Sequence, residues 1–83
     1  MPEISLAAVT VNQIPLDWNG NLRRIEESYD YLISKGYDLV CFPEMCLTGY
    51  GCEDQFLSPF TTEKALGSLQ KFSQKIQNSI AIV

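Results

Sequence analysis

The sequence has 83 residues, of which 46% are hydrophobic and 19% charged, with a net charge of -4. This balance lacks the basic footprint of nucleic-acid binding, so we expect no nucleic-acid partner. No apolar run approaches the roughly 20 residues that span a bilayer, and no positively charged leader is present. We therefore expect no membrane partner and a cytoplasmic location. The chain has no histidine, which excludes Ser-His and Cys-His catalytic pairs, and its three spaced cysteines do not indicate a metal site.

The first third of the chain predicts a strand, a loop and a helix. Residues 4–11 are rich in β-branched residues and nearly uncharged, which is typical of a strand. A helix is then expected to begin with Asp17 or Asn19 as its N-cap and to end at Gly36, which supplies a left-handed cap. Its buried stripe should consist of Leu22, Ile25, Tyr29, Leu32 and Ile33.

A second strand is predicted at residues 38–42, buried on both faces and with Cys41 in the core. The short joints around the helix predict parallel strands in a βαβ unit. Pro43 cannot donate a ladder hydrogen bond, so Glu44 should stand just past the carboxyl end of the strand. Ligands of open parallel sheets bind at that end, where a carboxylate can act as a general base. A surface glutamate without chemistry is the alternative.

Residues 45–60 show no long period and predict a functional loop. Tyr50 lies between two glycines, where it either faces a ligand or fills its own loop. The segment from Glu53 can form one helical turn, with Glu53 and Asp54 as structural acids at its positive end. Cys46 and Cys52 are expected to be free loop thiols.

A second helix is predicted from Thr61 or Thr62 to Gln77, and residues 79–83 predict a third strand. Asn78 is expected to end the helix in the left-handed conformation. The buried stripe of this helix should consist of Ala65, Leu69, Phe72 and Ile76, with Leu66 at its edge. A β-α-β-α-β unit of this kind leaves one sheet face uncovered, so we expect the chain to be the amino-terminal piece of a larger α/β domain.

Several segments together resemble the nitrilase (carbon–nitrogen hydrolase) superfamily. They are Ala7-Ala8-Val9-Thr10-Val11-Asn12-Gln13, Gly20-Asn21-Leu22, Leu39-Val40-Cys41-Phe42-Pro43-Glu44 and Leu47-Thr48-Gly49-Tyr50. The continuation from Gly49 to Phe56 is similar to the glutaminase domain of glutamine-dependent NAD synthetases. The resemblance covers essentially the whole chain.

The resemblance implies an αββα sandwich and a Glu-Lys-Cys catalytic triad. Glu44 matches the glutamate, the general base for a cysteine nucleophile, whereas no residue of this chain matches the lysine or the cysteine. The loop tyrosine, which Tyr50 matches, lies near the glutamine pocket and the entrance of an ammonia tunnel. Residues 1–83 would then be an incomplete glutaminase domain, inactive alone and without a second domain.

The resemblance also implies the substrates of the parent enzyme. Glutamine would supply ammonia to a second domain, which uses ATP and magnesium to adenylate deamido-NAD before ammonia displaces AMP. The segment itself would bind no cofactor, and the parent enzyme would be a homo-oligomer. Two alternatives remain from the sequence. One is a stand-alone amidase of the same superfamily, and the other is a flavodoxin-like binding or signalling module.

Overall fold

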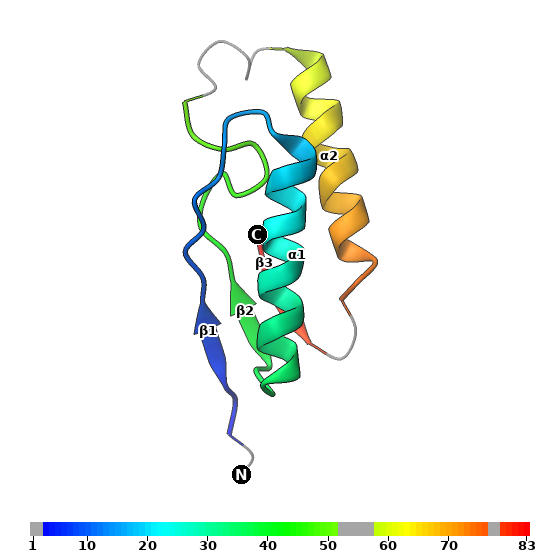
Figure 1. Cartoon of the computed structure of the whole chain (residues 1–83). Coiled ribbons are helices and arrows are strands. Elements are labelled where there is room, and N and C mark those ends of the chain that lie inside the picture. Colours follow the sequence, from blue (N-terminus) through cyan, green and yellow to red (C-terminus); the bar gives the residue numbers. More distant parts are fainter. Residues whose placement is uncertain (1–2, 52–57, 77–78) are drawn as a thin grey trace.

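The computed structural model describes residues 3–51, 58–76 and 79–83. Strands and helices alternate along these residues, as Figure 1 shows. In chain order they are β1 (Leu6–Ala8), α1 (Trp18–Ser34), β2 (Leu39–Cys41), α2 (Pro59–Ser73) and β3 (Ile80–Ile82). The predicted β-α-β-α-β order is confirmed. The first strand is shorter than predicted, since its ladder covers only part of residues 4–11.

The strands form a parallel sheet in the order β1-β2-β3. Val40 at the centre of β2 pairs with Ala7 on one side and Ala81 on the other. The ladder continues past the strand ends, because the amide of Val9 donates to the carbonyl of Cys41 and the amide of Phe42 to that of Ile82, each over 2.8 Å. The hydrogen bonding of the sheet therefore extends to the residue before Pro43.

Both helices lie on the same side of this sheet (Figure 1). Val40 is fully buried beneath them, in a core that also contains Leu22, Ile25, Tyr29, Phe42, Cys46 and Phe72. Side chains alternate between the two faces of a strand. The residues before and after Val40, and those that pair with them in β1 and β3, therefore point to the other face. On that face Leu6, Ile80 and Ile82 are 50–63% exposed. One face of the sheet is uncovered, as the sequence predicts.

The prediction that Cys41 lies in the core is wrong, because successive side chains of β2 point to opposite faces of the sheet. The strand is not buried on both faces in this chain, because the helices cover only the side to which Val40 points. Cys41 follows Val40 and so faces the other side, where its thiol is free and half-buried. The fully covered position of β2 is Val40.

Helix α1 agrees with the prediction at both ends. Asp17 is its N-cap and accepts a hydrogen bond from the amide of Gly20 over 3.2 Å. Gly36 has a φ of 89°, the left-handed conformation that stops a helix. Leu22, Ile25 and Tyr29 are buried, and the remaining members of the predicted stripe pack against the core at its margin.

Helix α2 differs from the prediction in its bounds and its buried face. It begins one turn earlier because Ser58 caps it and Pro59 occupies the first turn, where a missing N–H costs nothing. The face towards the core carries Thr61, Ser68 and Phe72.

The stripe predicted for the second helix is correct at Phe72 and at Ile76, which packs against the core, but wrong at Leu69. Leu69 is 37% exposed and Leu66 54% exposed, while Ala65 is half-buried. The small side chain of Ser68 is buried, while the larger side chains of Leu66 and Leu69 lie on the more exposed side of the helix. The predicted turn at residues 53–57 and the predicted cap at Asn78 lie outside the described residues.

Among the described residues, neither helix combines the length and the apolarity that crossing a bilayer would demand.

Candidate functional site at the carboxyl end of the second strand

Glu44 stands where the sequence predicts, at the carboxyl end of β2. Phe42 and Pro43 separate it from the last strand residue, and a turn begins at Glu44 itself. Its side chain is exposed, and within the described part of the chain its carboxylate makes no hydrogen bond or ion pair. The carboxylate is therefore available to a group brought up to the strand ends.

The loop after Glu44 has a tightly defined backbone. Met45 has a φ of 57°, in the left-handed region that a side chain of this size rarely adopts. The amide of Gly49 donates to the Met45 carbonyl over 2.7 Å and closes the turn. A Cβ on Gly49 would lie 2.8 Å from the backbone of Ile14, so only glycine lets the two loops approach this closely.

The first turn of α1 and the segment before it support this loop. Asn21 is fully buried, and its side-chain amide donates to the carbonyls of Leu47 and Ile14. Gln13 donates from Nε2 to the Cys46 carbonyl over 2.7 Å. The sequence did not identify these polar residues as functional, although both lie within motifs that carry the family resemblance.

An apolar hollow of about 190 Å³ opens beside the loop. Met45, Cys46, Leu47, Thr48, Ala65 and Val83 line it. Its lining comes from the Glu44 loop, from α2 and from the last residue after β3. The hollow thus lies at the carboxyl ends of the strands, where parallel sheets place their ligands.

Cys46 belongs to the core rather than to an open loop. Its side chain is 4% exposed, and burial raises the pKa of the Cys46 thiol. A thiol that stays protonated is a poor nucleophile. Cys46 therefore does not supply a catalytic thiolate, which agrees with the absence of a match to the family's cysteine.

Tyr50 is 60% exposed and does not fill its own loop. Cys52, Glu53 and Asp54 lie outside the described residues. Lys64 and Lys71 are exposed on α2, and Lys75, just past its end, forms an ion pair with Asp30 over 3.3 Å. Among the described residues, Glu44 stands at the strand end and Tyr50 lies on the loop that follows it.

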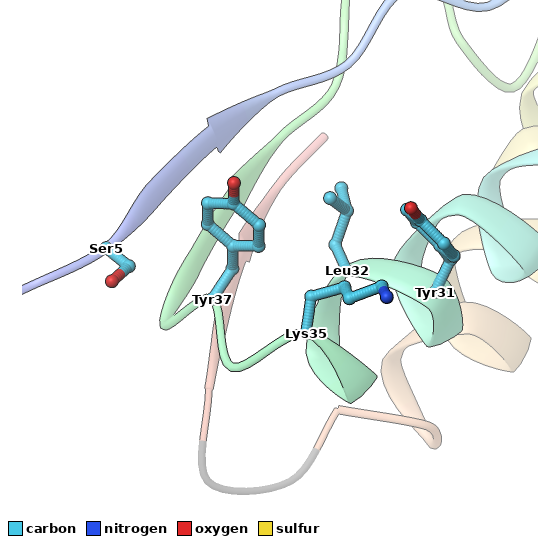
Figure 2. Close-up of a pocket in the computed structure, with 5 residues that line it drawn as sticks. All are labelled: Ser5, Tyr31, Leu32, Lys35 and Tyr37. Carbon is cyan, nitrogen blue, oxygen red and sulfur yellow. The ribbon is translucent and has the colours of Figure 1, made fainter.

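A second and larger hollow, of about 410 Å³, lies at the opposite end of the sheet. Figure 2 shows Ser5, Tyr31, Leu32, Lys35 and Tyr37 around it. Ser5 precedes β1 and Tyr37 precedes β2, so this is the amino end of the strands. The Lys35 ammonium lies 5.5 Å from the centre of the Tyr31 ring and is already engaged there. Because this hollow lies at the amino end of the strands, it is separate from the Glu44 site at their carboxyl end.

Comparisons with known proteins agree with this geometry. The family model for carbon-nitrogen hydrolases matches residues 5–83. A glutamine-dependent NAD(+) synthetase of Dictyostelium discoideum is 44% identical over 74% of the chain, and one of Saccharomyces cerevisiae is 39% identical over 90%. The chain covers only 9% and 10% of those two proteins.

Structural comparison points to the same group. The crystal structure of a glutamine-dependent NAD(+) synthetase from Cytophaga hutchinsonii matches 93% of this chain with a TM-score of 0.89 and 31% identity. The chain covers 13% of that structure. The resemblance to the amino-terminal region of such synthetases is confirmed, as is the expectation of a nitrilase-like α/β fragment. The chain belongs to the carbon–nitrogen hydrolase family.

Proposed function

We propose that this chain is the amino-terminal part of a glutaminase domain, in which Glu44 is the general base for hydrolysis of the glutamine amide. The supporting observation is the position of Glu44 at the carboxyl end of β2, where its exposed carboxylate has no partner among the described residues and the loop that follows it lines an apolar hollow. A base at this position can receive a proton from a nucleophile brought in by later strands. Similarity to glutamine-dependent synthetases supports glutamine as the substrate.

In the proposed reaction Glu44 takes the proton of a cysteine thiol. The thiolate attacks the amide carbon, the proton passes to the departing nitrogen, and ammonia leaves a thioester. Water, deprotonated by the same carboxylate, then releases glutamate and restores the thiol. A lysine would stabilise the negative charge on the carbonyl oxygen during both attacks. Because no described residue supplies the cysteine or the lysine, both belong to downstream chain in this proposal.

The ammonia would be used in NAD synthesis by the full-length protein, meaning this segment followed by the chain that its relatives have. We place Tyr50, exposed on the Glu44 loop, beside the glutamine pocket or the tunnel that carries ammonia away. The described residues contain no group of three His, Cys, Asp or Glu side chains that could hold a metal ion. We assign ATP, magnesium and deamido-NAD to the downstream chain by similarity to glutamine-dependent NAD(+) synthetases, and a cytoplasmic homo-oligomer remains our expectation.

The test is Glu44→Gln in the full-length protein. This change keeps the size of the side chain but removes the base, so we expect glutamine-driven NAD formation to fall by at least about 10³-fold. Ammonia-driven NAD formation should stay within about twofold, because free ammonia bypasses the glutaminase. Glu63→Gln, an exposed glutamate on α2, is the matched control and should change neither activity.

Two outcomes would overturn the proposal. If glutamine-driven activity survives Glu44→Gln, Glu44 is not the base. If both activities fall together with the folded fraction, the residue is structural. Ammonia release from glutamine without any NAD formation would instead indicate a stand-alone amidase of the same family.

A further inference from the structure

Asn21, in the first turn of α1, uses its whole side-chain amide in hydrogen bonds. Nδ2 donates to the carbonyls of Ile14 over 2.8 Å and Leu47 over 2.9 Å. Oδ1 accepts from the Ile14 amide over 2.9 Å and from Arg24 over 2.7 Å. The side chain is fully buried. A buried polar group with every position satisfied fixes the segments that it joins.

Gln13 extends the same network. Its Nε2 donates to the backbone carbonyls of Asn21 over 2.9 Å and Cys46 over 2.7 Å. Its Oε1 accepts from Nε of Arg24 over 2.6 Å, which orients the amide. Arg24 thus contacts both amides, and charge-assisted bonds of this kind are stronger than neutral ones.

Three consecutive backbone carbonyls of the Glu44 loop accept hydrogen bonds from Gln13, Asn21 and Leu16. The Cys46 carbonyl accepts from Gln13, that of Leu47 accepts from Asn21, and that of Thr48 accepts from the Leu16 amide over 2.8 Å. Two of these donors come from the segment between β1 and α1, which runs beside the Glu44 loop in Figure 1, and the third comes from the first turn of α1.

We propose that Asn21 and Gln13 are positioning residues that set the orientation of Glu44 for catalysis, an inference that rests on the proposed role of Glu44. The Glu44 carboxylate has no hydrogen bond or ion pair of its own among the described residues, so its backbone determines where it points. The adjacent Met45 is left-handed, a conformation that persists only when its surroundings enforce it. The hydrogen bonds to the carbonyls of Cys46, Leu47 and Thr48 hold the loop in this conformation.

The first test is Asn21→Asp in the full-length protein. The substitution keeps the acceptor for the Ile14 amide and for Arg24 but replaces the donor to the Leu47 and Ile14 carbonyls with an oxygen that repels both. We expect the kcat for glutamine hydrolysis to fall roughly 10–100-fold, the effect of displacing a catalytic group by about 1 Å. The KM for glutamine and the ammonia-driven activity should each stay within about twofold.

A second variant is needed because a change at fully buried Asn21 could lower activity through misfolding alone. Gln13→Glu changes a half-buried side chain, keeps its bond from Arg24 and loses the donor to the Cys46 and Asn21 carbonyls. It should reproduce the loss in kcat, while Gln13→Asn shows whether a shorter amide restores part of it. Asn19→Asp makes the same chemical change at an exposed position of the same helical turn and should leave kcat unchanged.

The outcomes separate this inference from the proposed function. With Glu44→Gln inactive on glutamine, normal kcat in both Asn21→Asp and Gln13→Glu would overturn the positioning role alone. Loss of glutamine-driven and ammonia-driven activity together, in both variants, would make the network purely structural and would also overturn it. An active Glu44→Gln would refute the role of Glu44 first.

Discussion

The ring of Phe42, two residues before Glu44, packs edge-on against the ring of Phe72, with centroids 5.6 Å apart and planes at 88°. Phe72 also meets Tyr29 of α1 edge-on at 5.5 Å. One side chain of α2 therefore links the other helix to the strand end that carries the candidate base. Aromatic pairs in this geometry add about 0.5–1.5 kcal/mol beyond the burial of their area.

Phe72→Ala should accordingly be the most damaging truncation on α2. Phe72 is 1% exposed, so its removal leaves a cavity and should lower the free energy of unfolding by about 3–5 kcal/mol. Urea unfolding followed by circular dichroism measures the loss. Leu69→Ala, at a position 37% exposed, is the control and should cost about 1 kcal/mol or less. Equal losses would mean that the leucine side of α2 also packs against the core.

Alanine substitutions at Gly49 and Gly51 should distinguish the cost of a strained backbone from the cost of a steric clash at the new Cβ. Gly49 and Gly51 share a φ of 79°, so alanine is strained by about 1–2 kcal/mol at both. At Gly49 a Cβ would also lie 2.8 Å from Ile14, whereas at Gly51 its contact is an ordinary 3.8 Å from Pro15. Gly49→Ala should therefore lower the thermal midpoint more than Gly51→Ala. Equal shifts would show that the Ile14 segment moves away freely.

Much of the fold follows from local pattern. The apolar run of β2, the spacing of Leu22, Ile25 and Tyr29, and the glycine at position 36 each predict an element or a boundary that is present in the structure. Pro43 likewise marks the strand end that carries Glu44. These features are predictable because they depend on residues close together in the sequence.

Features that depend on tertiary contact were not predictable in this way. Leu69 has the apolar character of a buried stripe but is 37% exposed, whereas the polar side chains of Thr61 and Ser68 are buried on the same helix. The Ser58–Pro59 pair was a usable signal for the start of α2, since serine caps and proline tolerates the first turn. Nothing in the pattern around Asn21 shows that its amide meets Leu47, because that pairing exists only once the loops are adjacent.

The two faces of the sheet should respond differently to charge. Ile80 and Ala81 are neighbours in β3, but Ile80 is 62% exposed on the open face while Ala81 packs against the core. Ala81→Lys forces an ammonium under the helices and should cost several kcal/mol, on the order of 3 or more. Ile80→Lys should cost about 1 kcal/mol or less in the 83-residue chain, measured by urea unfolding. The opposite order would contradict the assigned register.

The cysteines should differ in reactivity and in their contribution to pH dependence. In a Cys52→Ser background, a thiol reagent at neutral pH should label half-buried Cys41 and reach Cys46 only on unfolding. Burial raises the pKa of Cys46 above its ordinary value of 9.0, so above that pH the unfolded chain loses this proton more readily than the folded chain. Stability should therefore fall as pH rises past this value, and Cys46→Ala should remove that part of the fall. Rapid labelling of native Cys46 would contradict its place in the core.

The 83-residue chain alone should release no ammonia from glutamine. Glu44 has no catalytic partner among the described residues, because buried Cys46 is held as a thiol and the described lysines lie just past α1, on α2 or paired with Asp30. A carboxylate that activates only water lacks both the nucleophile and the oxyanion stabilisation that give such enzymes most of their rate. A coupled glutamate dehydrogenase assay, with the full-length protein as the positive control, measures the activity. Turnover that disappears in Glu44→Gln would show that residues 1–83 already contain a nucleophile, and it would remove the need to place the cysteine downstream.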